Sequence, residues 1–395
     1  MDHHATTPVD ARVLKAMLPY FTERFGNAAS RSHAFGRQAR EAVEVARAEV
    51  AALVGARAED VVFTSGATEA DNLALKGSAR LVRERHGASR LVVPRTEHKA
   101  VVDSARRLER EGFALRWLEG RRDGRVDPAE VVAALDEGPP VALVSVMLCN
   151  NEVGAVNDVA AIGAACRERG VLFHCDATQG LGYVPFDVGD ADLISLSAHK
   201  LYGPKGVGAL VVPKRGGRRA AVVAELDGGG HERGMRSGTL PVPLIVGFGA
   251  AARLQADEGP AEAERLRALR DELAARLGRL EGVTVFGPDL GGARHPGNLN
   301  LAFEAVRSEA LMLALDEAVA ISSGAACSSA SVEPSYVLRA MGVPREQAAG
   351  SLRFGLGRSN DRQQVDEVAR AVEAAVGELR ERSPEWRLRG ETLDW

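Results

Sequence analysis

The sequence is poor in lysine, cysteine and aromatic residues, and it contains no long apolar run. Aromatic residues make up 5% of the 395 positions, and the net charge of -4 comes from interspersed signs without a basic run that carries aromatics. This pattern argues against nucleic acid as a direct partner. No apolar stretch approaches the ~20 residues that a membrane span needs, and no basic-then-apolar signal begins the chain. We therefore expect a cytoplasmic protein without a membrane partner.

The few cysteines show no spacing typical of a zinc site or a disulfide framework. Cys149, Cys166 and Cys175 lie within apolar or helical patterns, where cysteine is usually a small buried hydrophobic residue. Cys327 differs, because it lies at 322–331 in SSGAACSSAS. Small and polar residues cannot form a core, so this segment predicts a mobile loop that carries a thiol.

Lysine is scarce enough that each one calls for an explanation: among 50 basic residues, lysine occurs only at 15, 76, 99, 200, 205 and 214. Lys200 follows the apolar strand pattern 193–196 and precedes a Gly/Pro turn at 203–206. A low-dielectric site would lower the pKa of this amine and free it as a nucleophile for Schiff-base chemistry. A strand-end lysine whose ammonium group reaches water is the alternative.

Helical and strand patterns alternate through the first half of the chain, and the strands are continuous runs of Val, Leu and Ile. Such strands are buried on both faces, as in a parallel sheet that helices cover. The expected strands are 61–64, 91–93, 113–118, 141–148, 171–175 and 193–196. The expected helices are 41–53, two that begin near 68 and 99, 129–135 and 159–169. We predict an α/β fold whose large, mainly parallel, doubly wound domain spans 10–249.

The composition changes at a charged helix expected over 261–280. Beyond it we expect strands near 283–286, 298–303, 319–322 and 352–357, and helices near 308–316, 335–341 and 363–382. These elements predict a smaller α+β domain, which we assign to residues 1–9 together with 250–395 and which carries the cysteine loop at 322–331.

Two segments at strand ends suit an anionic, ring-containing cofactor. After strand 61–64, the backbone N–H groups of a helix start, close approach at Gly66 and the hydroxyl of Thr68 form a site for a phosphate. An ordinary helix cap is the alternative. Asp176, after strand 171–175, could keep a pyridoxal ring nitrogen protonated, or it could cap a turn. Together with a strand-end Lys200, these residues predict a pyridoxal phosphate (PLP) enzyme.

Other polar residues are expected at the same sheet edge. His98 follows strand 91–93 and could stack on a ring and move protons, or cap a helix. Arg353 lies on the polar face of its strand among small neighbours, which leaves room for a bidentate carboxylate or for an intradomain ion pair. The glycine-rich, charged segment 228–239 suits a phosphate or a subunit contact.

At these residues the sequence resembles the cysteine desulfurases of the IscS/NifS type, within the class V aminotransferase-like branch of the fold-type I PLP enzymes. Eight motifs in order carry the resemblance: ATTPVD at 5–10, TSGATE at 64–69, TEHKAV at 96–101, NNEVG at 150–154, DATQ at 176–179, HKLYGPKG at 199–206, GGGHERGMRSGT at 228–239 and SSGAACSSASVEPSYVLRAMG at 322–342. The long cysteine-bearing loop resembles the housekeeping, iron-sulfur-assembly branch more than the branch that includes selenocysteine lyases.

The resemblance implies a role for each matching residue. It implies catalytic roles for Lys200 as the Schiff-base lysine, His98 as the ring-stacking acid/base group and Cys327 as the sulfur-accepting nucleophile. It implies that PLP contacts Ala67, Thr68, Asn151, Asp176, Gln179, Ser197, His199, Lys200 and Thr239, the last from the other subunit of a homodimer. It implies that Asn151 and Arg353 bind the substrate carboxylate.

The implied reaction converts L-cysteine to L-alanine and leaves a persulfide on Cys327. The sulfur would pass to an iron-sulfur scaffold protein and to sulfur-relay proteins for tRNA thiolation. The resemblance implies no resident metal, although Cys327 is a candidate transient iron-sulfur ligand. Cys149 lies close to the pocket residues in sequence and is a candidate second thiol. Another fold-type I PLP enzyme, such as an aminotransferase or a selenocysteine lyase-like enzyme, and a non-catalytic sulfur carrier are the alternatives.

Overall fold

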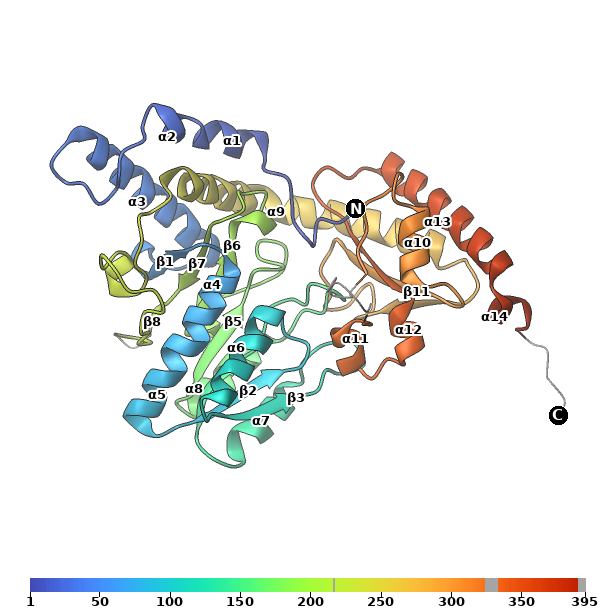
Figure 1. The fold of residues 1–395 in the computed structure, drawn as a ribbon, viewed down its shortest axis with the longest axis horizontal. Coiled ribbons are helices and arrows are strands. Elements are labelled where there is room, and N and C mark those ends of the chain that lie inside the picture. The colour runs from blue at the N-terminus through green and yellow to red at the C-terminus, as the bar shows by residue number, and fades with distance from the viewer. Residues whose placement is uncertain (216, 324–332, 390–395) are drawn as a thin grey trace.

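The computed structural model describes residues 1–215, 217–323 and 333–389 (Figure 1). Its larger sheet has the strand order β1-β7-β6-β5-β4-β2-β3. Neighbours from β6 to β3 are parallel, whereas β7 is antiparallel to β1 and β6, because the connection 198–207 is too short for a parallel crossover. The strands are β1 (Val61–Thr64), β2 (Arg90–Pro94), β3 (Ala114–Leu118), β4 (Val141–Ser145), β5 (Leu172–Asp176), β6 (Leu193–Ser197) and β7 (Gly208–Val211).

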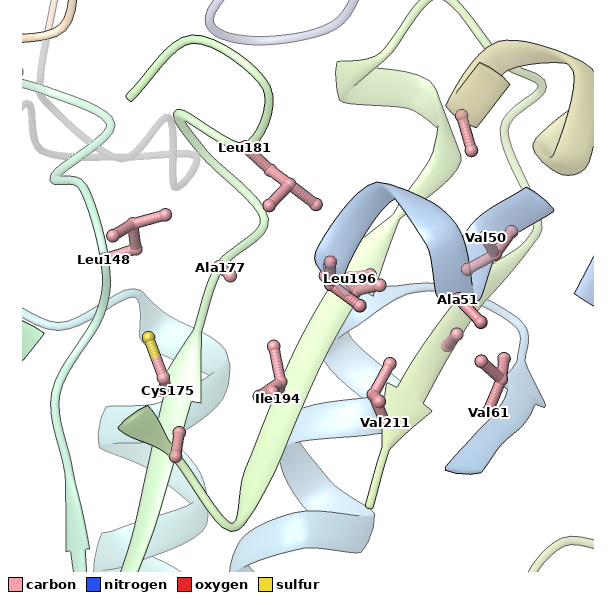
Figure 2. Packing of buried hydrophobic residues seen from close by; sticks show 14 of the residues in the cluster. Val50, Ala51, Val61, Leu148, Cys175, Ala177, Leu181, Ile194, Leu196 and Val211 are labelled. Carbon is pink, nitrogen blue, oxygen red and sulfur yellow. The ribbon is translucent and has the colours of Figure 1, made fainter. Parts of the chain in front are cut away.

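Helices cover both faces of this sheet, which explains why its inner strands do not alternate apolar and polar residues. Every residue of β1, β2, β4, β6 and β7 is buried, and only the edge strand β3 alternates. Figure 2 shows one face, where Val50 of α3, Val61 of β1 and Val211 of β7 belong to one core cluster. The surrounding helices are α1 (Ala11–Met17), α2 (Pro19–Thr22), α3 (Ala34–Val54), α4 (Ala67–Asn72), α5 (Ser78–His86), α6 (Lys99–Arg110), α7 (Pro128–Asp136), α8 (Val159–Glu168) and α9 (Val242–Leu277).

A second, antiparallel sheet has the order β10-β11-β12. Its strands are β10 (Val283–Phe286), β11 (Asn298–Phe303) and β12 (Ser351–Gly355), and its helices are α10 (Ser308–Ala314), α11 (Tyr336–Ala340), α12 (Arg345–Ala349), α13 (Arg362–Arg382) and α14 (Pro384–Arg387). The 36-residue helix α9 runs from the first sheet to the second (Figure 1). The division at residue 249 falls within α9 and stays a prediction. No helix in the described ranges combines the length and apolarity of a membrane span.

The N-terminal segment joins the two parts of the molecule. Asp2 forms a parallel bridge with Gly355 at the end of β12, and His3 N donates to Gly355 O at 3.0 Å. A few residues further on, Thr7 N donates to His199 O at 3.1 Å, directly after β6. Residues 1–7 therefore pass from the small sheet to the carboxyl end of the large one.

Four predicted elements were wrong in detail, and one of them is the strand expected at 141–148, which ends at Ser145. The strand expected at 319–322 is absent, because only Ser322 forms an isolated bridge there, with Arg353. The helix expected from residue 41 begins at Ala34, where the ring of His33 accepts from Gly36 N and caps it. The charged helix expected at 261–280 is the second half of α9.

Candidate active site

A cavity of about 630 Å³ opens at the carboxyl ends of β1, β5 and β6, where ligands bind in sheets of this kind. The cavity brings together ten of the predicted site residues: Ala67, Thr68, His98, Asn151, Asp176, Gln179, Ser197, His199, Lys200 and Arg353. Thr239 is exposed and does not line it, and Cys327 lies outside the described residues. Residues far apart in the sequence thus converge on one site.

One end of the cavity has the features of an anion cradle. Gly66 has φ 156°, which side chains rarely allow, and it turns the chain from β1 into α4. Helix geometry leaves the first N–H groups of α4, at Ala67 and Thr68, without intrahelical acceptors. The hydroxyl of Ser197 is buried and has no partner among the described residues. These donors suit a phosphate group.

Two side chains of the cavity lining, Asp176 and His98, suit contact with an aromatic ring. Asp176 is buried at the end of β5, and its carboxylate accepts from Thr178 N at 2.9 Å. His98 caps α6, since its Nδ1 accepts from Ala100 N at 3.2 Å. The surrounding protein lowers the pKa of His98 by desolvation. A neutral ring that accepts at Nδ1 carries its proton on Nε2, so His98 both caps the helix and offers a donor to the cavity.

Lys200 lies in a single 3-10 turn directly after β6, and its Nζ donates to Ala5 O at 3.0 Å and to His4 O. The pKa of Lys200 is lowered to about 8, mainly by desolvation and then by the charge of Arg353, while the charges of Asp176 and Asp2 act in the opposite direction. Two backbone carbonyls hold this amine in the cavity. The geometry therefore favours the nucleophile over the strand-end lysine that reaches water.

His199 lies beside Lys200 and is held by the N-terminal segment. Its Nδ1 lies 3.1 Å from Thr6 Oγ1, and its carbonyl accepts from Thr7. Burial, followed by the charges of Lys200 and Lys205, lowers the pKa of His199 to about 4. The ring is neutral at physiological pH and can contribute a hydrogen bond, but no charge, to a phosphate.

Asn151 and Arg353 form the end of the cavity that faces the small sheet. The Asn150 side chain accepts from Glu152 N at 2.9 Å and Val153 N at 3.0 Å, which forms the turn that presents Asn151. Arg353 Nη1 donates to the Asn151 carbonyl at 3.0 Å. Arg353 also pairs with Asp2, so an intrachain ion pair and a cavity-facing guanidinium coexist.

Sequence reasoning missed a group of buried acids behind Asp176. Burial and the charge of Asp176 raise the pKa of Asp71 and of Glu97. His174 lies between Ser145 Oγ, 2.8 Å from its Nδ1, and Ser195 Oγ, 2.9 Å from its Nε2, and burial lowers its pKa to about 4. The sequence offered one signal for His174: it lies two residues before Asp176 on the same strand, and residues two apart on a strand share a face.

Cys149 lines the cavity, as the sequence suggested, but it is buried. Its thiol lies 3.7 Å from Gly154 O and 3.8 Å from Asn150 O, and burial raises its pKa. Cys149 is therefore a neutral thiol near neutral pH and is poorly suited to act as a nucleophile.

The residues that line the cavity fit PLP in their chemistry. The donor-rich end matches a phosphate, and Asp176 matches a protonated ring nitrogen. Two buried polar atoms in the lining, Ser197 Oγ and Gln179 Oε1, lack partners within the described part of the chain and can pair with a bound group. Lys200 provides the amine.

The family model for "Aminotransferase class-V" matches residues 1–368. A protein named cysteine desulfurase IscS from Anaeromyxobacter sp. (strain Fw109-5) is 57% identical over 397 residues, which cover 100% of this chain and 96% of that protein. The chain belongs to the cysteine desulfurases of the class-V aminotransferase family. An IscS from Escherichia coli O9:H4 (strain HS) is 48% identical over 398 residues, with coverage of 100% and 96%.

Solved structures agree with this membership. One titled NifS-like protein superposes with a TM-score of 0.87 at 33% identity, covering 95% of this chain and 98% of that one. DndA from Streptomyces lividans gives a TM-score of 0.76 at 41% identity, covering 89% and 97%. The predicted family, α/β fold class, enzyme class and PLP cofactor of this cysteine desulfurase are thereby confirmed. The roles assigned to single residues stay predictions.

Proposed function

We propose that this cysteine desulfurase removes sulfur from L-cysteine, releases L-alanine and passes the sulfur from Cys327 to acceptor proteins. The observation that carries the proposal is the convergence of Lys200, Asp176 and Arg353 on one cavity. These groups provide an amine, a ring-nitrogen partner and a carboxylate receptor. PLP, when bound, delocalises the negative charge that forms at the substrate Cα.

Each part of the cavity has its own task in holding the cofactor. The Ala67 and Thr68 backbone, with Ser197 and His199, would bind the phosphate, and Thr239 would join it from the partner of a homodimer. Asp176 would accept a hydrogen bond from the ring nitrogen and keep it protonated. His98 would cover the ring, and Gln179 would lie near its hydroxyl. The exposed position of Thr239 outside the lining supports a contribution from a second copy.

Lys200 moves the proton of the substrate Cα. With a pKa of about 8, about a tenth of this amine is neutral at pH 7, far more than for an ordinary lysine. Neutral Nζ takes the proton and returns one to the alanine that forms. Arg353 and Asn151 hold the substrate carboxylate while this occurs.

Cys327 accepts the sulfur. Its thiolate attacks the substrate sulfur, an S–S bond forms, and the C–S bond breaks with its electron pair left on the carbon side, which then takes up protons. A thiol near pKa ~8.5 is only a few per cent thiolate at pH 7, so the site must favour the thiolate. The persulfide then passes sulfur in the cytoplasm to an iron-sulfur scaffold protein and to sulfur-relay proteins for tRNA thiolation.

Product measurements test this function directly. Purified enzyme with L-cysteine and a thiol reductant should release sulfide and alanine in equal amounts. Lys200→Ala should abolish both, and Cys327→Ala should abolish both while keeping the absorbance change that L-cysteine causes on the cofactor. Sulfide release by Cys327→Ala at most of the wild-type rate would remove Cys327 from the mechanism. Amino-group transfer to a keto acid would favour an aminotransferase instead.

A further inference from the structure

The arginine proposed to bind the substrate carboxylate already holds a carboxylate of the chain itself. Arg353 Nη2 donates to Asp2 Oδ1 at 2.9 Å. The other oxygen of Asp2, Oδ2, accepts from Ser322 Oγ at 2.7 Å. The Arg353 side chain is 8% exposed and that of Asp2 is 24% exposed, so water screens this pair less than a surface pair.

Arg353 keeps its place without help from Asp2. Its Nη1 donates to Asn151 O at 3.0 Å, its backbone N donates to Ser322 O at 2.7 Å, and β12 holds it opposite Asn300 of β11. Its Nε is buried and has no acceptor in the part of the chain that the structure describes. Asp2 therefore occupies a donor of a guanidinium that other contacts already orient.

The same segment also engages a second cation of the cavity, Lys200. Lys200 Nζ donates to the carbonyls of His4 and Ala5, which follow Asp2 closely in sequence. Residues 2–5 thus supply the partners of both groups that are expected to receive substrate and cofactor. A ligand with a carboxylate must compete with this segment for Arg353.

We propose that Asp2 is an internal competitor of the substrate carboxylate and sets the affinity of the site for α-amino acids. The inference rests on the proposed role of Arg353. An incoming carboxylate displaces Asp2 from Nη2, and Asp2 keeps its contact with Ser322. Apparent affinity then equals the intrinsic affinity multiplied by the fraction of molecules in which Arg353 is free.

Equilibrium titration separates this effect from turnover. L-alanine is added to the PLP-loaded enzyme, and binding is followed by cofactor absorbance in the wild type and in Asp2→Asn. Asparagine is nearly the same size as aspartate but uncharged, so Asp2→Asn removes the ion pair without a large change in volume. The Kd for L-alanine should therefore fall about fivefold to thirtyfold, the effect expected for a partly buried ion pair. The KM for L-cysteine should fall with it. Cysteamine has no carboxylate, and its Kd should stay unchanged.

Matched variants control for general loosening of the N-terminal segment. Asp10→Asn removes a carboxylate just after this segment that pairs with Arg12 and Arg358 outside the cavity lining, and it should leave both Kd values unchanged. Ser322→Ala removes a contact that Asp2 keeps before and after its displacement, so it should leave the Kd for L-alanine nearly unchanged. A thermal unfolding curve of Asp2→Asn close to that of the wild type shows that the variant is folded.

The outcomes distinguish a failure of this inference from a failure of the proposed function on which it rests. An unchanged or higher Kd for L-alanine in Asp2→Asn overturns it, as does an equal change for cysteamine. If Arg353→Leu weakens L-alanine binding while Asp2→Asn has no effect, only the competitor role is wrong. If Arg353→Leu leaves L-alanine binding intact, the proposed carboxylate site itself is wrong.

Discussion

A buried ion pair ties the glycine-rich segment 228–239 to the start of the anion cradle. Arg47 Nη1 and Nη2 donate to the two carboxylate oxygens of Glu232 at 2.6 and 2.8 Å, and the side chains are 4% and 2% exposed. Glu232 also accepts from Phe63 N at 2.7 Å in β1, and Arg47 Nη1 donates to Val61 O at 2.9 Å. The pair therefore locks this segment to the strand that leads into α4.

Replacing Glu232 with alanine leaves Arg47 buried without a counter-ion and Phe63 N without its acceptor. Removing one partner of a buried pair costs about 3–5 kcal/mol. At ~2.1 cal/mol/K per residue, the 395-residue chain has an unfolding entropy of ~0.8 kcal/mol/K, so Tm should fall by about 4–6 °C. Thermal unfolding at fixed PLP concentration measures this change. The double variant Arg47→Met/Glu232→Met removes the lone charge and should recover part of the loss.

The control is an exposed pair with a single short contact. Arg95 Nε lies 2.7 Å from Glu119 Oε1, but the side chains are 46% and 62% exposed. Glu119→Ala should cost about 0–1 kcal/mol, because water screens the pair and its side chains lose entropy in pairing. Equal Tm changes for Glu232→Ala and Glu119→Ala would refute the argument that the Arg47–Glu232 pair contributes more to stability because it is buried.

Three further predictions concern the cavity. Asp176→Asn removes the charge beside the ring nitrogen and should lower kcat about 10²-fold to 10³-fold, with a change in the cofactor absorbance spectrum as the second measurement; a fully active variant would contradict this role. His98→Ala should lower kcat by about 10²-fold or more while PLP, measured by absorbance after dialysis, stays bound; full turnover would exclude acid/base work by His98. Lys200 has a lowered pKa in the folded chain, so the unfolded chain binds more protons between about pH 8 and its ordinary value, 10.5. The ammonium form of Lys200 therefore destabilises the folded chain below pH 8. Lys200→Met should raise the Tm of PLP-free protein most below pH 8, and the gain should shrink as the pH rises toward 10. A Tm difference that does not depend on pH would contradict this prediction.

Strands and strand-end residues were predictable because both follow from local chemistry. Runs such as Val61–Phe63 and Leu193–Leu196 are buried on both faces, and the carboxyl ends of such strands share one edge. Asp176 and Lys200 therefore met as expected. The strand pattern was enough to predict that these two residues share one site, without any knowledge of tertiary contacts.

The full length of α9 was not predicted, because tertiary packing overrides its local composition. Gly247 and Gly249 near its start and Pro260 near its middle have poor helix propensity. In the structure, a Cβ at Gly247 would lie 2.5 Å from Met17 Sδ, and one at Gly249 would lie 2.6 Å from Ala46 Cα. The glycines thus permit close contact with α1 and α3, and that packing outweighs their poor helix propensity.

The contact of Asp2 with Arg353 joins residues 351 positions apart, and no local pattern indicates it. The buried acids Asp71 and Glu97 likewise resemble solvated charges in sequence. Their identity as interior groups depends on neighbours that only the folded chain provides. For this reason, roles that depend on contacts between residues far apart in the chain could not be predicted from the sequence.

The length of α9 limits where the chain can be divided into two fragments that still fold. At 1.5 Å per residue its 36 residues form a rod of about 54 Å. Ala250, Ala251 and Ala252 still pack in the core of the large sheet, while Leu266 and Leu273 belong to the core of the small one. A fragment that stops at residue 249 would lack part of its own core and should be recovered as aggregate, whereas co-expressed halves divided in a surface loop should reassemble.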